Sequence, residues 1–136
     1  MSARYLLDTD TCIYVLRRRE PRIVRRFAAH AHHAAISVIT LGELEYGAAT
    51  SSDPAAARAA IELLRETVAV DPLPPDAAGA YGRLRATLRE RGTPIGQNDL
   101  WLAAHALASD LVMVTNNEKE FRRVPGLKVL NWARTG

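Results

Sequence analysis

The stretch Tyr5-Leu6-Leu7-Asp8-Thr9-Asp10-Thr11 decides how the rest of the chain is interpreted. Its first three residues form a short apolar run that ends abruptly in a carboxylate, which is typical of a buried strand. Ligands of open α/β sheets bind just outside the carboxyl ends of such strands, so Asp8 stands where acids usually act on metals or phosphates. The alternative is that Asp8 or Asp10 only caps the following helix, because aspartate is a favoured N-cap residue.

Size and composition limit the class of protein. The chain has 136 residues, of which 48% are hydrophobic, and this predicts a single domain over 1–136 with a sizeable core. No apolar run approaches the roughly 18 residues that cross a bilayer, and we expect no signal peptide and no membrane partner. The single cysteine, Cys12, excludes an intramolecular disulfide and fits the cytoplasm, where we expect the protein to act.

The charge of the chain is compatible with a nucleic-acid partner. The formal net charge is +3, and nearly all of the basic side chains are arginines, which pair well with phosphate. Arginine-rich helices are also common as solvated surfaces, so charge alone does not decide the question. The candidate RNA-binding residues come from two arginine clusters and are Arg17, Arg18, Arg22, Arg85 and Arg89.

Short β-prone runs alternate with helical patterns along the whole chain. After the first run, strands are expected at 34–38, 68–70, 111–114 and, at an edge of the sheet, 127–130. Helices are expected over 11–19, 22–32, 55–66, 76–91, 97–107 and 118–123, with one more that opens near Ser37 or Thr40. Strands separated by helices predict a parallel sheet flanked by helices, and therefore an α/β fold.

Acidic side chains lie near the carboxyl ends of the predicted strands. Asp8 follows the first strand, Glu43 lies in the helix after the second, and Asp99 lies in the first turn of an apolar helix. Glu118 and Glu120 begin the helix after the fourth strand. Because the carboxyl ends of parallel strands converge, we expect these acids to meet at one edge of the sheet. A hard cation such as Mg²⁺ would remove the repulsion between them.

Each acid also has a purely structural interpretation. Asp99 could complement the dipole of its helix, Glu43 could face solvent, and Glu118 and Glu120 could form a charged surface turn. The apolar neighbours of Asp8 and Asp99 favour a functional interpretation, because an unpaired carboxylate is costly in such surroundings.

Four acidic motifs, present in order, resemble those of the PIN-domain ribonucleases, and most closely those of the VapC toxins of type II toxin–antitoxin systems. The motifs are 6–10, 39–47, 95–99 and 114–121, and the resemblance covers essentially the whole chain. It implies a PIN-like three-layer α/β/α fold with a central, mainly parallel sheet of four to five strands. It also implies that Asp8, Glu43 and Asp99 are catalytic residues that bind Mg²⁺, which Mn²⁺ can replace.

The resemblance assigns roles to neighbouring residues as well. Glu120 matches a fourth catalytic acid that is commonly aspartate, so we expect it to reach the metal through water. Asp10 is expected to cap the first helix or to support the metal ligands, in place of Asp8. Thr115 and Asn116 are expected to orient the carboxylates or a metal-bound water.

The implied activity is endonucleolytic hydrolysis of an RNA phosphodiester, with a tRNA as the implied target, by metal-activated water. The resemblance also implies inhibition by a small VapB-type antitoxin and assembly into a homodimer. One alternative is a catalytically silent PIN-like module that binds RNA or a protein partner.

A second alternative is a phosphatase. Asp8-Thr9-Asp10-Thr11 fits the D-x-D-x-T motif of haloacid-dehalogenase phosphatases, in which Asp8 would be the nucleophile. These enzymes also need a late acidic pair, and no aspartate follows Asp110 in this chain.

The histidines and tryptophans are expected to have structural roles. The three histidines of 30–33 are interpreted as helix-end cations or surface residues, because a histidine near a helix C-terminus suits the dipole. His105, on the helix of Asp99, is expected to face either the site or a neighbouring helix. Trp101 and Trp132 are expected to pack against the core.

Overall fold

The apolar run Tyr5–Leu7 forms β1, the central strand of a five-stranded sheet in this computed structural model, which describes residues 3–134. The strand order is β3-β2-β1-β4-β5, and every neighbouring pair is parallel. The other strands are β2 (Ala34–Ser37), β3 (Ala69–Asp71), β4 (Val112–Val114) and β5 (Val129–Leu130). The last strand therefore occupies an edge, as predicted.

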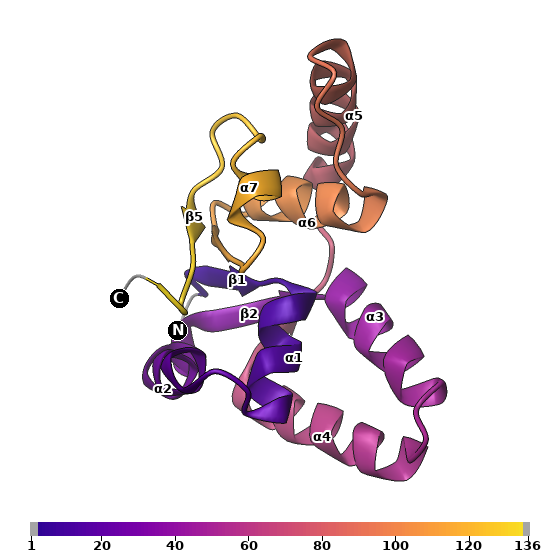
Figure 1. The fold of residues 1–136 in the computed structure, drawn as a ribbon. Helices are drawn as coiled ribbons and strands as arrows, with labels where there is room; N and C mark the ends of the chain where they lie inside the picture. The colour runs from indigo at the N-terminus through magenta and orange to yellow at the C-terminus, as the bar shows by residue number, and fades with distance from the viewer. Residues whose placement is uncertain (1–2, 135–136) are drawn as a thin grey trace.

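Helices cover both faces of the sheet (Figure 1). They are α1 (Thr9–Arg17), α2 (Pro21–His30), α3 (Val38–Ala49), α4 (Pro54–Thr67), α5 (Asp76–Glu90), α6 (Gln97–Ala108) and α7 (Glu118–Phe121). A 3₁₀ turn, η1 (Ala31–His33), follows α2 and ends the helical pattern that the sequence predicted over 22–32. Across residues 3–134, none of the helices is long and apolar enough to cross a membrane. The three-layer α/β/α fold with a parallel sheet is confirmed.

The side chains of the strands alternate between two buried clusters. In β1, Leu6 packs with α5, α6 and α7, whereas Tyr5 and Leu7 pack with α1, α2, α3 and α4. The neighbouring strand β4 alternates in the same way, with Met113 in the first cluster and Val114 in the second. Successive side chains of a strand point to opposite faces, so a short apolar run buried on both faces supplies both layers of the core.

The residues at the carboxyl ends of β1 and β2 cap the helices that follow these strands. Asp8 follows β1 and accepts a hydrogen bond from Thr11 N, so α1 begins two residues earlier than the sequence pattern predicted. Ser37 ends β2 and caps α3 by accepting a bond from Ile39 N. Because no loop separates strand from helix, the first turns of α1 and α3 both lie at the carboxyl edge of the sheet.

Aromatic side chains join the two ends of the chain. Trp132 is buried and packs edge-on against Tyr5, with ring centroids 5.7 Å apart, which confirms the packing role predicted for it. His30 is the last residue of α2, as predicted, and its ring packs against both of these rings. Trp101 stacks on Tyr81 at 3.9 Å and so joins α6 to α5.

The buried face of α6 should carry much of the stability. Leu102 is 0% exposed, and Leu63 on α4 is 63% exposed. We expect Leu102→Ala to lower the free energy of unfolding by about 2–5 kcal/mol, because it removes buried methyl groups and leaves a cavity. Leu63→Ala, the same change on an exposed helical face, should stay within about 0.5 kcal/mol. Urea unfolding monitored by circular dichroism measures both, and equal effects would contradict the assignment of the core.

Candidate active site

Asp8 lies at the carboxyl end of the central strand and is only 3% exposed. Its Oδ1 accepts a 2.8 Å hydrogen bond from Thr11 N, and its Oδ2 accepts a 2.5 Å bond from the Thr115 hydroxyl, which follows β4. The backbone N–H of Asp8 donates to Val114 O at 3.0 Å. The first turn of α1 and the end of β4 therefore fix the direction of both carboxylate oxygens.

The hydrogen bond from Thr11 makes Asp8 the N-cap of α1, so the prediction that the capping role passes to Asp10 is wrong. Asp10 lies inside the first turn, and its side chain is exposed. A cap must precede the first turn, and α1 starts so soon after β1 that Asp8 is the only acid in that place. Asp8 thus combines a capping role with its place at the site.

The environment of Asp8 favours its protonated form. Burial raises the pKa of its carboxyl to about 6, and the negative charge of Asp10 acts in the same direction. Hydrogen bonds from Thr115 and Thr11 stabilise the carboxylate and limit the rise. A fully buried acid with a pKa near neutrality is unusual for a helix cap and is typical of a functional site.

Glu43 lies in the first half of α3 and is oriented by a residue of α1. The Thr9 hydroxyl donates to Glu43 Oε1 at 2.5 Å, and the hydroxyl oxygen of the buried Thr40 lies 3.2 Å from that of Thr9. Neither threonine was expected from the sequence to act at the site. The available signal for Thr9 was its place between two acids, Asp8 and Asp10. The sequence does not show which carboxylate the hydroxyl contacts, because that depends on how α1 packs on α3.

The negative charges of the other acids at this edge of the sheet all raise the pKa of Asp99. It lies in the first turn of α6, and its pKa is raised to about 7. Burial is the largest cause, followed by the charges of Glu120, Asp8, Glu43 and Asp10 in that order. Acids from three other segments of the chain therefore act on this one carboxylate, as the sequence predicted from the convergence of strand ends.

Glu120 joins α7 to the start of α6. Its Oε1 accepts a 2.9 Å hydrogen bond from Gly96 N, and its Oε2 accepts a 2.6 Å bond from Asn117 Nδ2. Gly96 immediately precedes α6, so this contact brings the charge of Glu120 next to the helix turn that carries Asp99. Among the neighbouring charges, that of Glu120 has the largest effect on the pKa of Asp99.

Glu118, which the sequence placed among the same acids, has a different environment. Its carboxylate accepts hydrogen bonds from Arg122 and Arg134, both at 2.9 Å, and from Asn131 at 3.1 Å. The bond from Arg122 is the main reason why the pKa of Glu118 is lowered. Glu118 is therefore neutralised by arginines and ties α7 to the C-terminal segment.

The segment after β4 supplies further polar groups. Thr115 accepts a 2.8 Å bond from Asn117 N while it donates to Asp8, so the turn itself orients the hydroxyl. Asn116 is half-buried, and within residues 3–134 its buried Nδ2 has no hydrogen-bond partner. Buried donors are usually paired, and an amide of this kind suits a water or a phosphate oxygen.

The donor set at this edge fits a hard divalent cation. Every charge that shifts the pKa of Asp99 is negative, and all of the donors are oxygens, which Mg²⁺ and Mn²⁺ prefer. In the described part of the chain, no three acidic, histidine or cysteine side chains already form an arrangement that would hold a metal ion. The fit is therefore one of charge and donor type.

The first arginine cluster divides into two groups. Arg17, at the end of α1, is exposed and lines the same groove as Glu43. Arg18 is also exposed and takes a left-handed backbone conformation after α1. Arg22 is exposed too, and it donates to Ala133 O at 3.2 Å, which ties α2 to the C-terminal segment.

The second cluster lies beside the start of α6. Arg85 donates to Tyr81 Oη at 3.0 Å and covers that ring at 5.9 Å. Arg85 and Arg89 line a hollow of about 370 Å³ together with Gln97 and Ile95, which lie at the approach to Asp99. These two arginines therefore flank the loop that leads into the acidic site.

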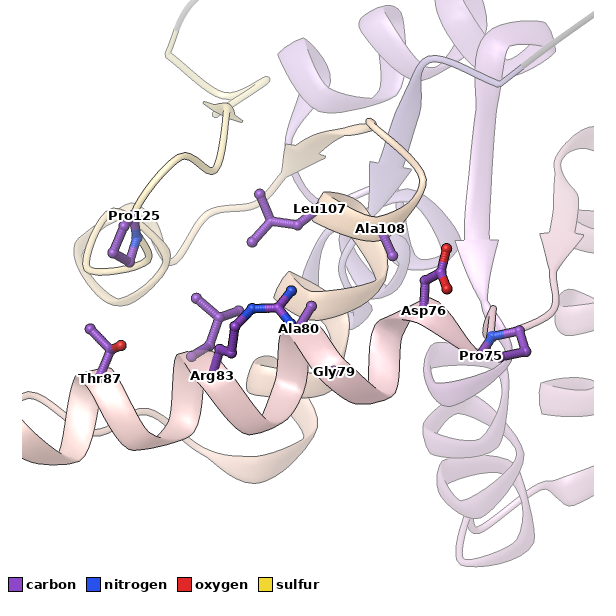
Figure 2. Close-up of a pocket in the computed structure, with 10 residues that line it drawn as sticks. Pro75, Asp76, Gly79, Ala80, Arg83, Thr87, Leu107, Ala108 and Pro125 are labelled. Carbon is purple, nitrogen blue, oxygen red and sulfur yellow. The ribbon is translucent and has the colours of Figure 1, made fainter.

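A separate hollow of about 660 Å³ lies at the opposite end of α6 (Figure 2). Leu107 and Ala108 of α6 line it, with Arg83 and Gly79 of α5 and with Pro125 across from them. It contains none of the four acids that act on Asp99. We assign no role to this hollow in the chemistry of the acidic site.

The comparisons with known proteins agree with this arrangement. The family model of the PIN domain matches residues 5–127. The chain belongs to the PIN-domain family.

Its relatives within that family are VapC proteins. Ribonuclease VapC2 of Haemophilus influenzae is 40% identical to this PIN domain over 129 residues, which cover 95% of this chain and 98% of that protein. The tRNA(fMet)-specific endonuclease VapC of Salmonella typhimurium is 39% identical, with the same coverage. The crystal structure of DNA-bound VapBC from Salmonella typhimurium has a TM-score of 0.91 and 38% identity, covering 96% of this chain and 98% of that one.

The family assignment decides between the alternatives that the first motif left open. A PIN domain accounts for all four acidic segments, whereas the phosphatase motif accounts only for Asp8 and Asp10. The haloacid-dehalogenase interpretation therefore loses its support.

The repulsion at Asp99 should make this PIN domain less stable at neutral pH in the absence of metal. A carboxyl whose pKa is higher in the folded state than in the unfolded state binds more protons when the protein is folded. The stabilisation that this proton binding gives is complete below about pH 4, and it is lost as the pH rises through about 7. We expect Asp99→Asn to raise the melting temperature at pH 7.5 by a few degrees, which corresponds to about 1 kcal/mol after allowance for partial exposure. At pH 5 the change should be small.

The measurement is thermal unfolding in EDTA at the two pH values. Asp110→Asn is the matched control, since Asp110 is exposed at the far end of α6 and asparagine tolerates its positive φ of 54°. An equal effect of Asp99→Asn at both pH values would contradict the charge repulsion.

Proposed function

We propose that this protein is a Mg²⁺-dependent endoribonuclease and the toxin of a type II toxin–antitoxin system. The observation that carries the proposal is that acids from three other segments converge on Asp99, in a PIN domain whose relatives are named as ribonucleases. The name of the Salmonella typhimurium relative supports tRNA as the substrate class, with initiator tRNA as the first candidate. The protein would act in the cytoplasm, where tRNA is found.

Asp8, Glu43 and Asp99 are the residues that would hold the cation, with Glu120 beside them. When bound there, Mg²⁺ or Mn²⁺ would supply a water of lowered pKa and offset the negative charge on the reacting phosphate. Thr115 and the Thr11 N–H hold both oxygens of Asp8, and Thr9 holds one oxygen of Glu43. These hydrogen bonds limit the side-chain freedom that metal binding would otherwise remove.

Arginines around the site would draw in the substrate. An acidic pocket repels the RNA backbone, so cations at its edge are needed for association. Arg85 and Arg89 beside the start of α6, and Arg17 beside Glu43, are the exposed arginines that meet this need.

Cleavage of RNA should depend on both the metal and the acids. We expect Asp8→Asn and Asp99→Asn each to lower the rate of tRNA cleavage in Mg²⁺ by at least about a hundredfold, since even residues that only support metal ligands cost 10–100-fold. Gel analysis of cleavage of purified tRNAs, with EDTA as a blank, measures this. Asp110→Asn should retain the activity.

Two outcomes would contradict the proposal. Cleavage that persists in a double Asp8→Asn and Asp99→Asn variant would show that another group, or a contaminating nuclease, is responsible. If the unaltered protein binds RNA but cleaves none in Mg²⁺ or Mn²⁺, the protein is the silent binding module and not an enzyme.

A groove beside Glu43 is the surface that we propose for the antitoxin. It has a volume of about 740 Å³, lies between α1, α3 and α4, and is lined by Ile13, Leu16, Leu44 and Ile61 among others. Glu43 also lines it, so a peptide that fills the groove reaches the acidic site. The VapBC assembly of the Salmonella typhimurium relative supports a VapB-type partner. A homodimer is proposed from the family resemblance alone.

A side chain that fills the groove should release the protein from its antitoxin. Ala60 lines the groove, whereas Ala59, its neighbour on α4, is exposed and does not. We expect Ala60→Trp to weaken binding of the small protein encoded beside this gene at least tenfold, and Ala59→Trp to leave it unchanged. Co-purification and growth rescue on co-expression measure the effect. Equal binding by both variants would place the antitoxin on another surface.

A further inference from the structure

His105 is a fully buried polar residue that the proposed chemistry does not use. It lies on α6, the helix that carries Asp99, and its side chain is 0% exposed. Its Nδ1 lies 2.9 Å from Ser37 Oγ, and its Nε2 lies 3.6 Å from Asp71 Oδ2. Leucine or alanine would fill such a position at lower cost, because a buried polar ring must find partners.

The polar neighbours of His105 are the ends of two adjacent strands: Nδ1 is hydrogen-bonded to Ser37, whereas Nε2 is too far from Asp71 for a hydrogen bond and interacts with it through charge alone. Ser37 is the last residue of β2, Asp71 is the last residue of β3, and the two are paired in the parallel register. Ser37 is also the N-cap of α3, through the bond that its Oγ accepts from Ile39 N at 3.1 Å. His105 therefore connects α6 directly to the residue that starts α3.

The arrangement of protons follows from these contacts. Burial lowers the pKa of His105, and the nearby Asp71 only partly opposes this, so the ring is neutral. The Asp71 carboxylate favours the tautomer with the ring proton on Nε2, because the other tautomer would direct a nitrogen lone pair at that carboxylate. In the favoured tautomer Nδ1 is an acceptor, so the Ser37 hydroxyl donates to it while its oxygen accepts the Ile39 N–H.

The contact joins the two helices that carry Glu43 and Asp99. Glu43 lies on α3, after the Ser37 cap, and Asp99 lies on α6, before His105. Apolar packing alone is non-directional and allows two helices to slide against each other. A directional hydrogen bond between the ring and the cap selects one relative position.

We propose that His105 is a positioning residue of the acidic site, which fixes α6 against the start of α3 and thereby sets the separation of Asp99 from Glu43. The inference rests on the proposed function in one respect: the separation matters because both acids would hold the same cation. His105 itself touches neither the cation nor the substrate.

Affinity for Mn²⁺ in the absence of RNA tests the inference. We expect His105→Leu to remain folded but to raise the Mn²⁺ dissociation constant about tenfold, as is common when the support of a metal ligand is lost. His105→Asn, whose amide can still reach Ser37, should recover most of the affinity. Isothermal titration calorimetry gives the dissociation constants, and thermal unfolding gives the stability of each variant.

Leu102→Ala is the matched control for stability. Leu102 is on the same helix and equally buried, so its loss destabilises α6 without removing a polar contact. We expect this variant to melt earlier and to bind Mn²⁺ as tightly as the unaltered protein. If His105→Leu does not fold, Ser37→Ala removes the same bond from the side of the cap and should also weaken Mn²⁺ binding.

The outcomes separate this inference from the proposed function. An unchanged Mn²⁺ dissociation constant in His105→Leu, or an equal loss in Leu102→Ala, would overturn the positioning role while leaving the metal site intact. A failure of the unaltered protein to bind Mn²⁺ would overturn both the proposed function and the inference.

Discussion

Mutual repulsion between acids at the carboxyl edge of the sheet is the constraint on which the rest of this structure depends. Asp8 is buried to 3% exposure, and Asp99 carries a pKa of about 7 because burial and four neighbouring carboxylates oppose its charge. Such a group destabilises the metal-free fold at neutral pH. The two apolar clusters on either side of the sheet must offset that cost, and natural proteins commonly accept it where a ligand is to be bound.

The parallel sheet solves the geometric part of this problem. β1 pairs with both β2 and β4, so the segments that leave these three strands start side by side. Asp8 and Thr115 meet across β1 and β4, and Thr9 in the first turn of α1 meets Glu43 in the second turn of α3. α6 contributes Asp99 from the other layer of helices. His105 and Ser37 connect that layer to α3, so the positions of the acids depend on polar contacts as well as on apolar packing.

The contacts that the sequence did not predict share one physical feature. Whether Asp8 or Asp10 caps α1 depends on which carboxylate meets Thr11 N, and this is decided by a shift of two residues in the helix start. The partner of Thr9 depends on how α1 packs on α3, and the partner of Arg22 is a backbone carbonyl more than a hundred residues away in the sequence. Composition and periodicity carry no information about such contacts, because they describe neighbours along the chain.

The sequence by itself determined the alternation of strands and helices, the parallel sheet and the four acidic segments. Apolar periodicity and strand-end acids are local patterns, and the topology of parallel sheets then requires their ends to converge. Only the tertiary structure decided that Glu118 is neutralised by arginines, that Glu120 binds Gly96 N, and that His105 lies between Ser37 and Asp71. These contacts depend on side-chain directions and on distances between helices, which are set when both layers pack against the same sheet.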